Sequence, residues 1–212
     1  MIGKVTILDV CNFNIPNGKS NTDIKLKMEN NLKLQNVIDS KILNERKIFL
    51  WGHVDDESAK YVVERLMYLE LLSQGKEIQL IINSPGGYVT SGFAIYDSIK
   101  SISSPVSTIC TGLAASMGAI LLSAGEKGRR FILPNARVMI HQPSGGAGGS
   151  VTDIEIQMNE IIKTKNLGAK ILAENCGQLI EKVMKDFNRD HWMDALESME
   201  YGIVDSIIEK LV

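Results

Sequence analysis

Residues 77–87 read Glu-Ile-Gln-Leu-Ile-Ile-Asn-Ser-Pro-Gly-Gly, and they hold the clearest fold signal in the chain. The apolar run Leu80-Ile81-Ile82 is continuous, which is typical of a strand buried on both faces of a parallel sheet. Ser84-Pro85-Gly86-Gly87 breaks the run, and a helix is expected from about residue 89 to residue 102. A buried strand, a turn and a helix in this order indicate an α/β domain.

The same alternation continues on both sides of this stretch. Upstream, the pattern predicts a strand over 48–51 and a helix that is capped near Asp55 and ends near Gly75. Downstream, it predicts a strand over 106–110, a helix over 115–124, and strands over 131–133 and 137–140. We therefore expect an α/β fold with mostly parallel strand pairing.

The C-terminal third is predicted to be largely helical. It follows a glycine-rich segment, residues 144–150. Thr152 and Glu155 are interpreted as the capping box of a long helix that ends near Gly177. A short helix over 179–187 and a last one, capped by Asp194 and Glu197 and ended by Gly202, complete the prediction. Residues 12–36 are polar without a strong period, so a mobile or extended arm is expected there.

The composition is that of an ordinary globular protein. The 212 residues are 44% hydrophobic and 23% charged, with a formal net charge of -2. There is no basic excess that would predict binding to nucleic acid or to a membrane surface. Three cysteines far apart in the sequence argue against a disulfide framework or a zinc site. With no secretory signal at the N-terminus and no uniformly apolar span, a cytoplasmic location is expected.

A histidine is the usual general base for serine chemistry, and the chain has three: His53, His141 and His191. His141 ends a predicted strand, and Pro143 turns the chain just after it. Strand ends are common catalytic positions, although a solvated histidine at a strand end is the plainer interpretation of this residue alone.

Ser116 lies among small residues, in Gly-Leu-Ala-Ala-Ser-Met-Gly-Ala over 112–119. Small neighbours let other backbone approach the hydroxyl, as at a nucleophile elbow, but such a run is also typical of a tightly packed helix. The N–H groups of Gly87 and Met117 are candidate donors of an oxyanion hole. The residues alone leave the carboxylate partner open among several aspartates: Asp153, Asp186, Asp190, Asp194 and Asp205.

Together, these motifs resemble the proteolytic subunit of the Clp protease. The resemblance runs from about residue 44 to residue 210, and four motifs and two shorter matches carry it: 82–87, 114–119, 139–143, 152–156, Arg189-Asp190 and 200–205. It implies a catalytic triad of Ser116, His141 and Asp190. It also implies Gly87 and Met117 as the oxyanion donors and Arg189 as an oligomer contact.

The resemblance further implies a crotonase-like α/β domain over 44–212 with a protruding helix-and-strand handle at about 142–176. Residues 1–43 would be an N-terminal arm or axial segment. Such subunits form heptameric rings that stack into a tetradecamer, and they cleave unfolded polypeptides that a separate AAA+ unfoldase delivers. The chain lacks the motif G-x-x-x-x-G-K-[ST], so the partner is expected to use the ATP, and no metal or other cofactor is implied.

Three features depart from the family pattern. Residues 1–43 do not resemble the usual N-terminal segment, and Gln79 and Ile81 stand where the family commonly has tyrosines. Asn188 replaces an acidic residue that normally helps Arg189 bridge the two rings, so the ion-pair component of that contact is lost. Weaker coupling between the rings, or a divergent paralogue with another partner, is therefore a hypothesis.

Two other functions remain open at this point. A crotonase-type acyl-CoA enzyme also uses backbone N–H donors, but it would need carboxylates at the cleft rather than a serine and a histidine. A divergent or inactive ring subunit that regulates an active paralogue is the second alternative.

Overall fold

The computed structural model describes residues 21–211, and the chain divides into two units, residues 1–42 and 43–212. The described part of the first unit is helical and belongs to α1 (Asn21–Asn44). An extended conformation, one of the two expected for residues 12–36, was therefore wrong over residues 21–36, while residues 12–20 lie outside the described residues. The segment lacks an apolar period, but it contains several Lys and Leu residues and neither Pro nor Gly, and this composition allows a helix.

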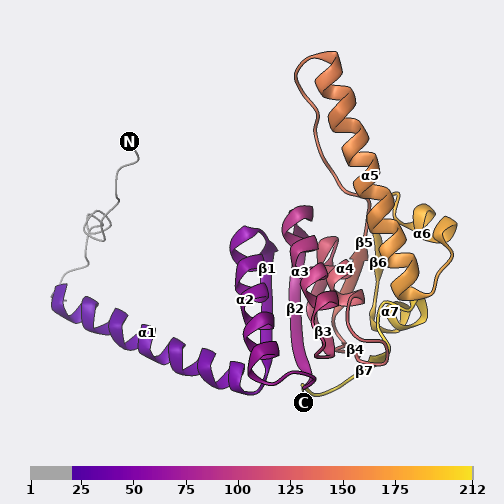
Figure 1. The fold of residues 1–212 in the computed structure, drawn as a ribbon. Helices are drawn as coiled ribbons and strands as arrows, with labels where there is room; N and C mark the ends of the chain where they lie inside the picture. Colours follow the sequence, from indigo (N-terminus) through magenta and orange to yellow (C-terminus); the bar gives the residue numbers. More distant parts are fainter. Residues whose placement is uncertain (1–20, 212) are drawn as a thin grey trace. The chain divides into compact units, whose positions relative to one another are not determined.

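The second unit is built on a seven-stranded sheet (Figure 1). The main path runs β1-β2-β3-β4-β7, with β5 paired to β3 and β6 paired to β5. All pairs are parallel except β5 with β6, so the predicted α/β fold with mostly parallel pairing is confirmed. The strands are β1 (Lys47–Val54), β2 (Ile78–Gly87), β3 (Val106–Ala115), β4 (Arg130–Ile132), β5 (Arg137–Ile140), β6 (His191–Met193) and β7 (Ser206–Ile207).

Six helices of this unit accompany the sheet: α2 (Asp56–Leu72), α3 (Val89–Ser101), α4 (Met117–Ser123), α5 (Val151–Cys176), α6 (Ile180–Asp186) and α7 (Ala195–Tyr201). In Figure 1, α2, α3 and α4 line up in front of β1, β2 and β3. Leu80, Ile81 and Ile82 of β2 are at most 1% exposed, as a strand covered on both faces requires. The core lies between this strand layer and the helices.

Two of the three predicted caps match the structure. Asp55 caps α2, and Asp194 forms a capping box with Glu197 at the start of α7. The box of α5 was assigned wrongly, because Ser150 and Asp153 form it instead of Thr152 and Glu155. Ser150 has an extended backbone that lets its Oγ accept from the Asp153 N–H, whereas Thr152 is already helical. The helix ends at Gly177, as predicted, and the structure shows that this glycine has a left-handed conformation.

The first half of α5 projects away from the sheet together with the chain that leads into it (Figure 1). We call residues 142–176 the handle. Residues 151–160 of the handle are all exposed, and the helix has buried residues only from Gly168 onward. No helix within residues 21–211 is both long enough and apolar enough to cross a bilayer.

Candidate active site

Strand pairing brings Ser116 and His141 to the same edge of the sheet. β3 pairs with β4 through residues 108–110 and then with β5 through residues 113–115, so its last part lies against β5. Because β3 and β5 are parallel, the residues that follow them meet. The Ser116 N–H donates to the Met139 carbonyl at 2.8 Å, and the Ser116 hydroxyl lies 2.9 Å from Nε2 of His141.

The antiparallel pair β5–β6 brings in Asp190. Ile140 of β5 lies opposite His191 of β6. His141 follows Ile140 and Asp190 precedes His191, so in an antiparallel pair these two residues are also neighbours. Nδ1 of His141 lies 3.0 Å from Oδ1 of Asp190. A carboxylate can only accept here, so Nδ1–H donates to Asp190 and Nε2 is left to accept from Ser116. The structure thus joins the three side chains in one hydrogen-bonded chain.

The backbone at Ser116 is strained. Its φ of 54° and ψ of −119° lie in a region that residues with a side chain rarely adopt. Such conformations persist only where the surroundings enforce them, and they are frequent at functional sites. Ser116 sits in the sharp turn between β3 and α4, which presents its hydroxyl to His141 rather than to the core.

The glycine turn after β2 packs directly against this serine. A Cβ on Gly86 would lie 2.8 Å from Cβ of Ser116 and 2.9 Å from N of Met117, so only glycine fits there. Gly87 follows with a φ of 158°, and a Cβ on it would collide with the Val54 carbonyl. Met117 is the first residue of α4, so its N–H has no acceptor within the helix. The glycine turn therefore lies beside the Met117 N–H, which is free to donate a hydrogen bond to an oxyanion.

The other histidines stand apart from Ser116. The His53 ring packs edge-on against Tyr88, with centroids 5.3 Å apart. The His191 ring lies 5.7 Å from the ring of Tyr201. Of the three candidate bases, His141 is the one that contacts the serine hydroxyl.

The remaining aspartates have structural partners of their own. Asp153 and Asp194 cap helices, and Asp186 accepts hydrogen bonds from Lys182 and Tyr201. Asp205 pairs with Arg130, whose side chain is 4% exposed. Burial alone would raise the pKa of Asp205, but hydrogen bonds from the guanidinium and backbone of Arg130 lower it overall. Of the five aspartates, Asp190 is the one that lies within hydrogen-bond distance of His141.

Gln142 lies within the motif 139–143 and was not among the predicted site residues. Its backbone N–H donates to the Phe187 carbonyl at 2.5 Å, and its side-chain amide donates to the Asn188 carbonyl at 2.9 Å. These two bonds hold the loop before β6 against the end of β5. Gln142 therefore helps to fix the spacing between His141 and Asp190. An amide that bridges two loops leaves no local pattern by which the sequence could have revealed it.

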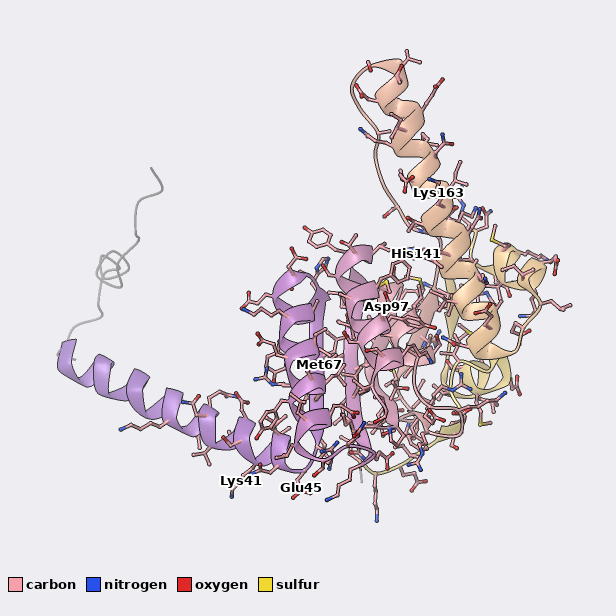
Figure 2. The ribbon with its side chains drawn as sticks, in the orientation of Figure 1. Lys41, Glu45, Met67, Asp97, His141 and Lys163 are labelled. Atoms are coloured by element: carbon pink, nitrogen blue, oxygen red, sulfur yellow. The ribbon has the colours of Figure 1, made fainter. Side chains whose placement is uncertain are left out.

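A small apolar pocket opens beside the serine hydroxyl. Its volume is about 30 Å³, and its lining contains no charged side chain: Val89, Phe93, Ser116, Met117, Ile120, His141, Pro143, Thr164, Gly168 and Phe187. Figure 2 shows His141 beside α5, at the base of the handle. The pocket therefore presents a mostly apolar wall next to the Ser116 hydroxyl.

Arg189 lies outside this arrangement. Its side chain is exposed, and no carboxylate within residues 33–211, the range whose side chains the structure describes, lies within ion-pair distance of it. Asn188, beside it, uses its carbonyl to accept from Gln142. The same described range contains no cluster of three or more His, Cys, Asp or Glu side chains that could hold a metal ion.

A family model described as Clp protease matches residues 29–211, which is most of the chain. The matched range contains the glycine turn after β2, Ser116, His141 and Asp190.

Proposed function

The chain belongs to the Clp protease family, a family of peptidases, and we propose that it is the serine endopeptidase subunit of an ATP-dependent, self-compartmentalised protease. The observation that carries the proposal is the hydrogen-bonded chain from Ser116 through His141 to Asp190, with distances of 2.9 Å and 3.0 Å. Nucleophile, base and orienting carboxylate in this order are the three parts of a serine hydrolase triad.

In the proposed reaction, Ser116 Oγ attacks the carbonyl carbon of a peptide bond while Nε2 of His141 takes its proton. The resulting tetrahedral oxyanion would accept from the N–H groups of Gly87 and Met117. His141 then gives the proton to the leaving amine, the C–N bond breaks, and an acyl-enzyme remains. Water hydrolyses the ester by the same steps, with His141 again as base. Asp190 orients the imidazole and stabilises its charged form.

The apolar pocket beside Ser116 supports a preference for substrates with an uncharged, apolar residue just before the cleaved bond, the P1 residue. Val89, Phe93 and Ile120 line it, and a charged side chain would lose its hydration there without a partner. Unfolded polypeptides expose such residues, whereas folded proteins bury them. An endopeptidase with this pocket therefore fits unfolded chains as substrates.

Members of this family generally oligomerise and work with ATPase partners, and we propose heptameric rings stacked into a tetradecamer with an AAA+ unfoldase. Exposed apolar side chains support self-association. Leu71 on α2 is 88% exposed, and Val151 and Ile156 on the handle are 74% and 58% exposed. Tyr68 and Leu72, which share a face of α2 with Leu71, are also exposed, and apolar groups gathered on a helix face in this way are typical of an interface. The subunit itself would need neither metal nor nucleotide and would act in the cytoplasm.

The proposal is tested by hydrolysis of a short fluorogenic peptide, with oligomer mass recorded on every sample. Wild type should cleave, whereas Ser116→Ala should lose cleavage and keep the same mass. Substituting His141 or Asp190 should also remove most turnover, and the losses should be far from additive because the three residues act as one unit. A wild type that forms rings but cleaves nothing would favour an inactive ring subunit instead.

A further inference from the structure

The pocket beside Ser116 is bounded on one side by a glycine in the middle of a helix. Gly168 lies within α5 and is buried, and it lines the pocket together with Ile120 and Phe187. Glycine is the poorest helix former after proline, so an interior helical glycine needs a reason of its own. Backbone conformation and close packing are the two usual reasons.

The backbone gives no reason for this glycine. Gly168 has helical geometry within Val151–Cys176, and it is not among the glycines of positive φ. Any residue with a side chain can adopt that conformation. Gly177, which ends the same helix at a φ of 67°, is the contrasting case in which the backbone does require glycine.

Close packing gives no reason either. A Cβ on Gly168 would lie 3.5 Å from Cζ of Phe187 and 3.6 Å from Cδ1 of Ile120, and both are ordinary van der Waals distances. An alanine would therefore fit without displacing its neighbours. Both neighbours line the pocket, so the added methyl group would stand in the pocket wall and take up some of its volume of about 30 Å³.

We propose that Gly168 sets the depth of the P1 pocket and so determines which apolar residue precedes the cleaved bond. This inference rests on the function proposed above. The missing side chain leaves room between Phe187 and Ile120 for the end of a longer substrate side chain such as leucine. One methylene in a hydrophobic pocket changes kcat/KM by about 10- to 200-fold, so a single added methyl group should have a measurable effect.

The test compares three peptides that differ only in having Ala, Leu or Phe at P1. Wild type should favour Leu over Ala. In Gly168→Ala, the ratio of kcat/KM for Leu to that for Ala should fall by about 10-fold or more, while the Ala peptide is still cleaved. Gly168→Leu should fill the space further and leave the Ala peptide as the best of the three.

Asn166→Ala is the matched control, because it also introduces a stronger helix former into α5 but at an exposed position away from the pocket. It should leave the Leu-to-Ala ratio unchanged. An unchanged ratio in Gly168→Ala, or an equal loss for all three peptides, overturns the inference while the proposed function stands. A wild type that cleaves none of the peptides overturns both.

Discussion

Removing the side-chain amide of Gln142 should slow catalysis without touching any of the three hydrogen-bonded residues. In Gln142→Ala, the backbone bond to the Phe187 carbonyl remains, and the 2.9 Å bond to the Asn188 carbonyl is lost. The loop that carries Asp190 is then held to the end of β5 by one bond fewer. We expect Asp190 to spend less time within hydrogen-bond distance of His141.

The size of the effect can be bounded from these contacts. A hydrogen bond of this kind contributes about 0.5–1.5 kcal/mol net, and a shift of about 1 Å in a catalytic group can cost about 100-fold in rate. Complete loss of the orienting carboxylate's function costs about 10,000-fold in a serine protease triad, which sets the upper limit. We therefore expect Gln142→Ala to lower kcat by about 10- to 100-fold.

The assay is a double-mutant cycle with Asp190→Asn, measured on a fluorogenic peptide. If Gln142 acts through Asp190, Gln142→Ala should have little further effect in the Asp190→Asn background. Gln178→Ala is the matched control, because that amide also donates to a backbone carbonyl, of Tyr201, at 2.9 Å. A rate unchanged by Gln142→Ala, or an equal loss in both backgrounds, would refute the positioning role.

Two further predictions concern stability and assembly. Asp205→Ala should lower the free energy of unfolding by about 3–5 kcal/mol at neutral pH, because it leaves the buried charge of Arg130 unpaired. Since folding lowers the pKa of Asp205, its contribution is present above its ordinary pKa of about 3.9 and lost as pH falls through the folded value. Urea unfolding at equal protomer concentration should show wild type and variant converging in acid. Asn188 cannot form an ion pair with Arg189, so we expect weak coupling between the two rings. Size analysis across salt concentrations should therefore show the double ring separating into single rings. A double ring that is stable at every salt concentration would contradict weak coupling.

The sequence predicted the elements whose pattern is local. A continuous apolar run marked β2, and an aspartate before an apolar face marked the starts of α2 and α7. These features follow from the contacts of a few neighbouring residues, so a short window contains them. The α5 box was missed because two overlapping pairs matched the same capping pattern, and only the backbone at Ser150 distinguishes them.

Features that depend on the pairing of strands far apart in the sequence could not be predicted from short stretches of it. β6 and β7 are too short to show a sequence pattern. The change of pairing partner along β3, from β4 to β5, also leaves no pattern in the sequence. Yet that switch brings Ser116 to His141, and β6 brings Asp190 to His141. Five aspartates were therefore open from the residues alone, and the family resemblance was what singled out Asp190. The positive φ of Ser116 was likewise hidden, because it is enforced by its neighbours in space.

Labelling with a fluorophosphonate tests most directly whether Ser116 is an activated nucleophile. Ser116 Oγ would attack phosphorus, fluoride would leave, and His141 would take the proton, so the adduct reports the same step as peptide cleavage. We expect one adduct, found on Ser116 by peptide mass spectrometry, and its near loss in His141→Ala. A wild type that stays unlabelled in its assembled form, or a label on another serine that His141→Ala does not change, would contradict the account.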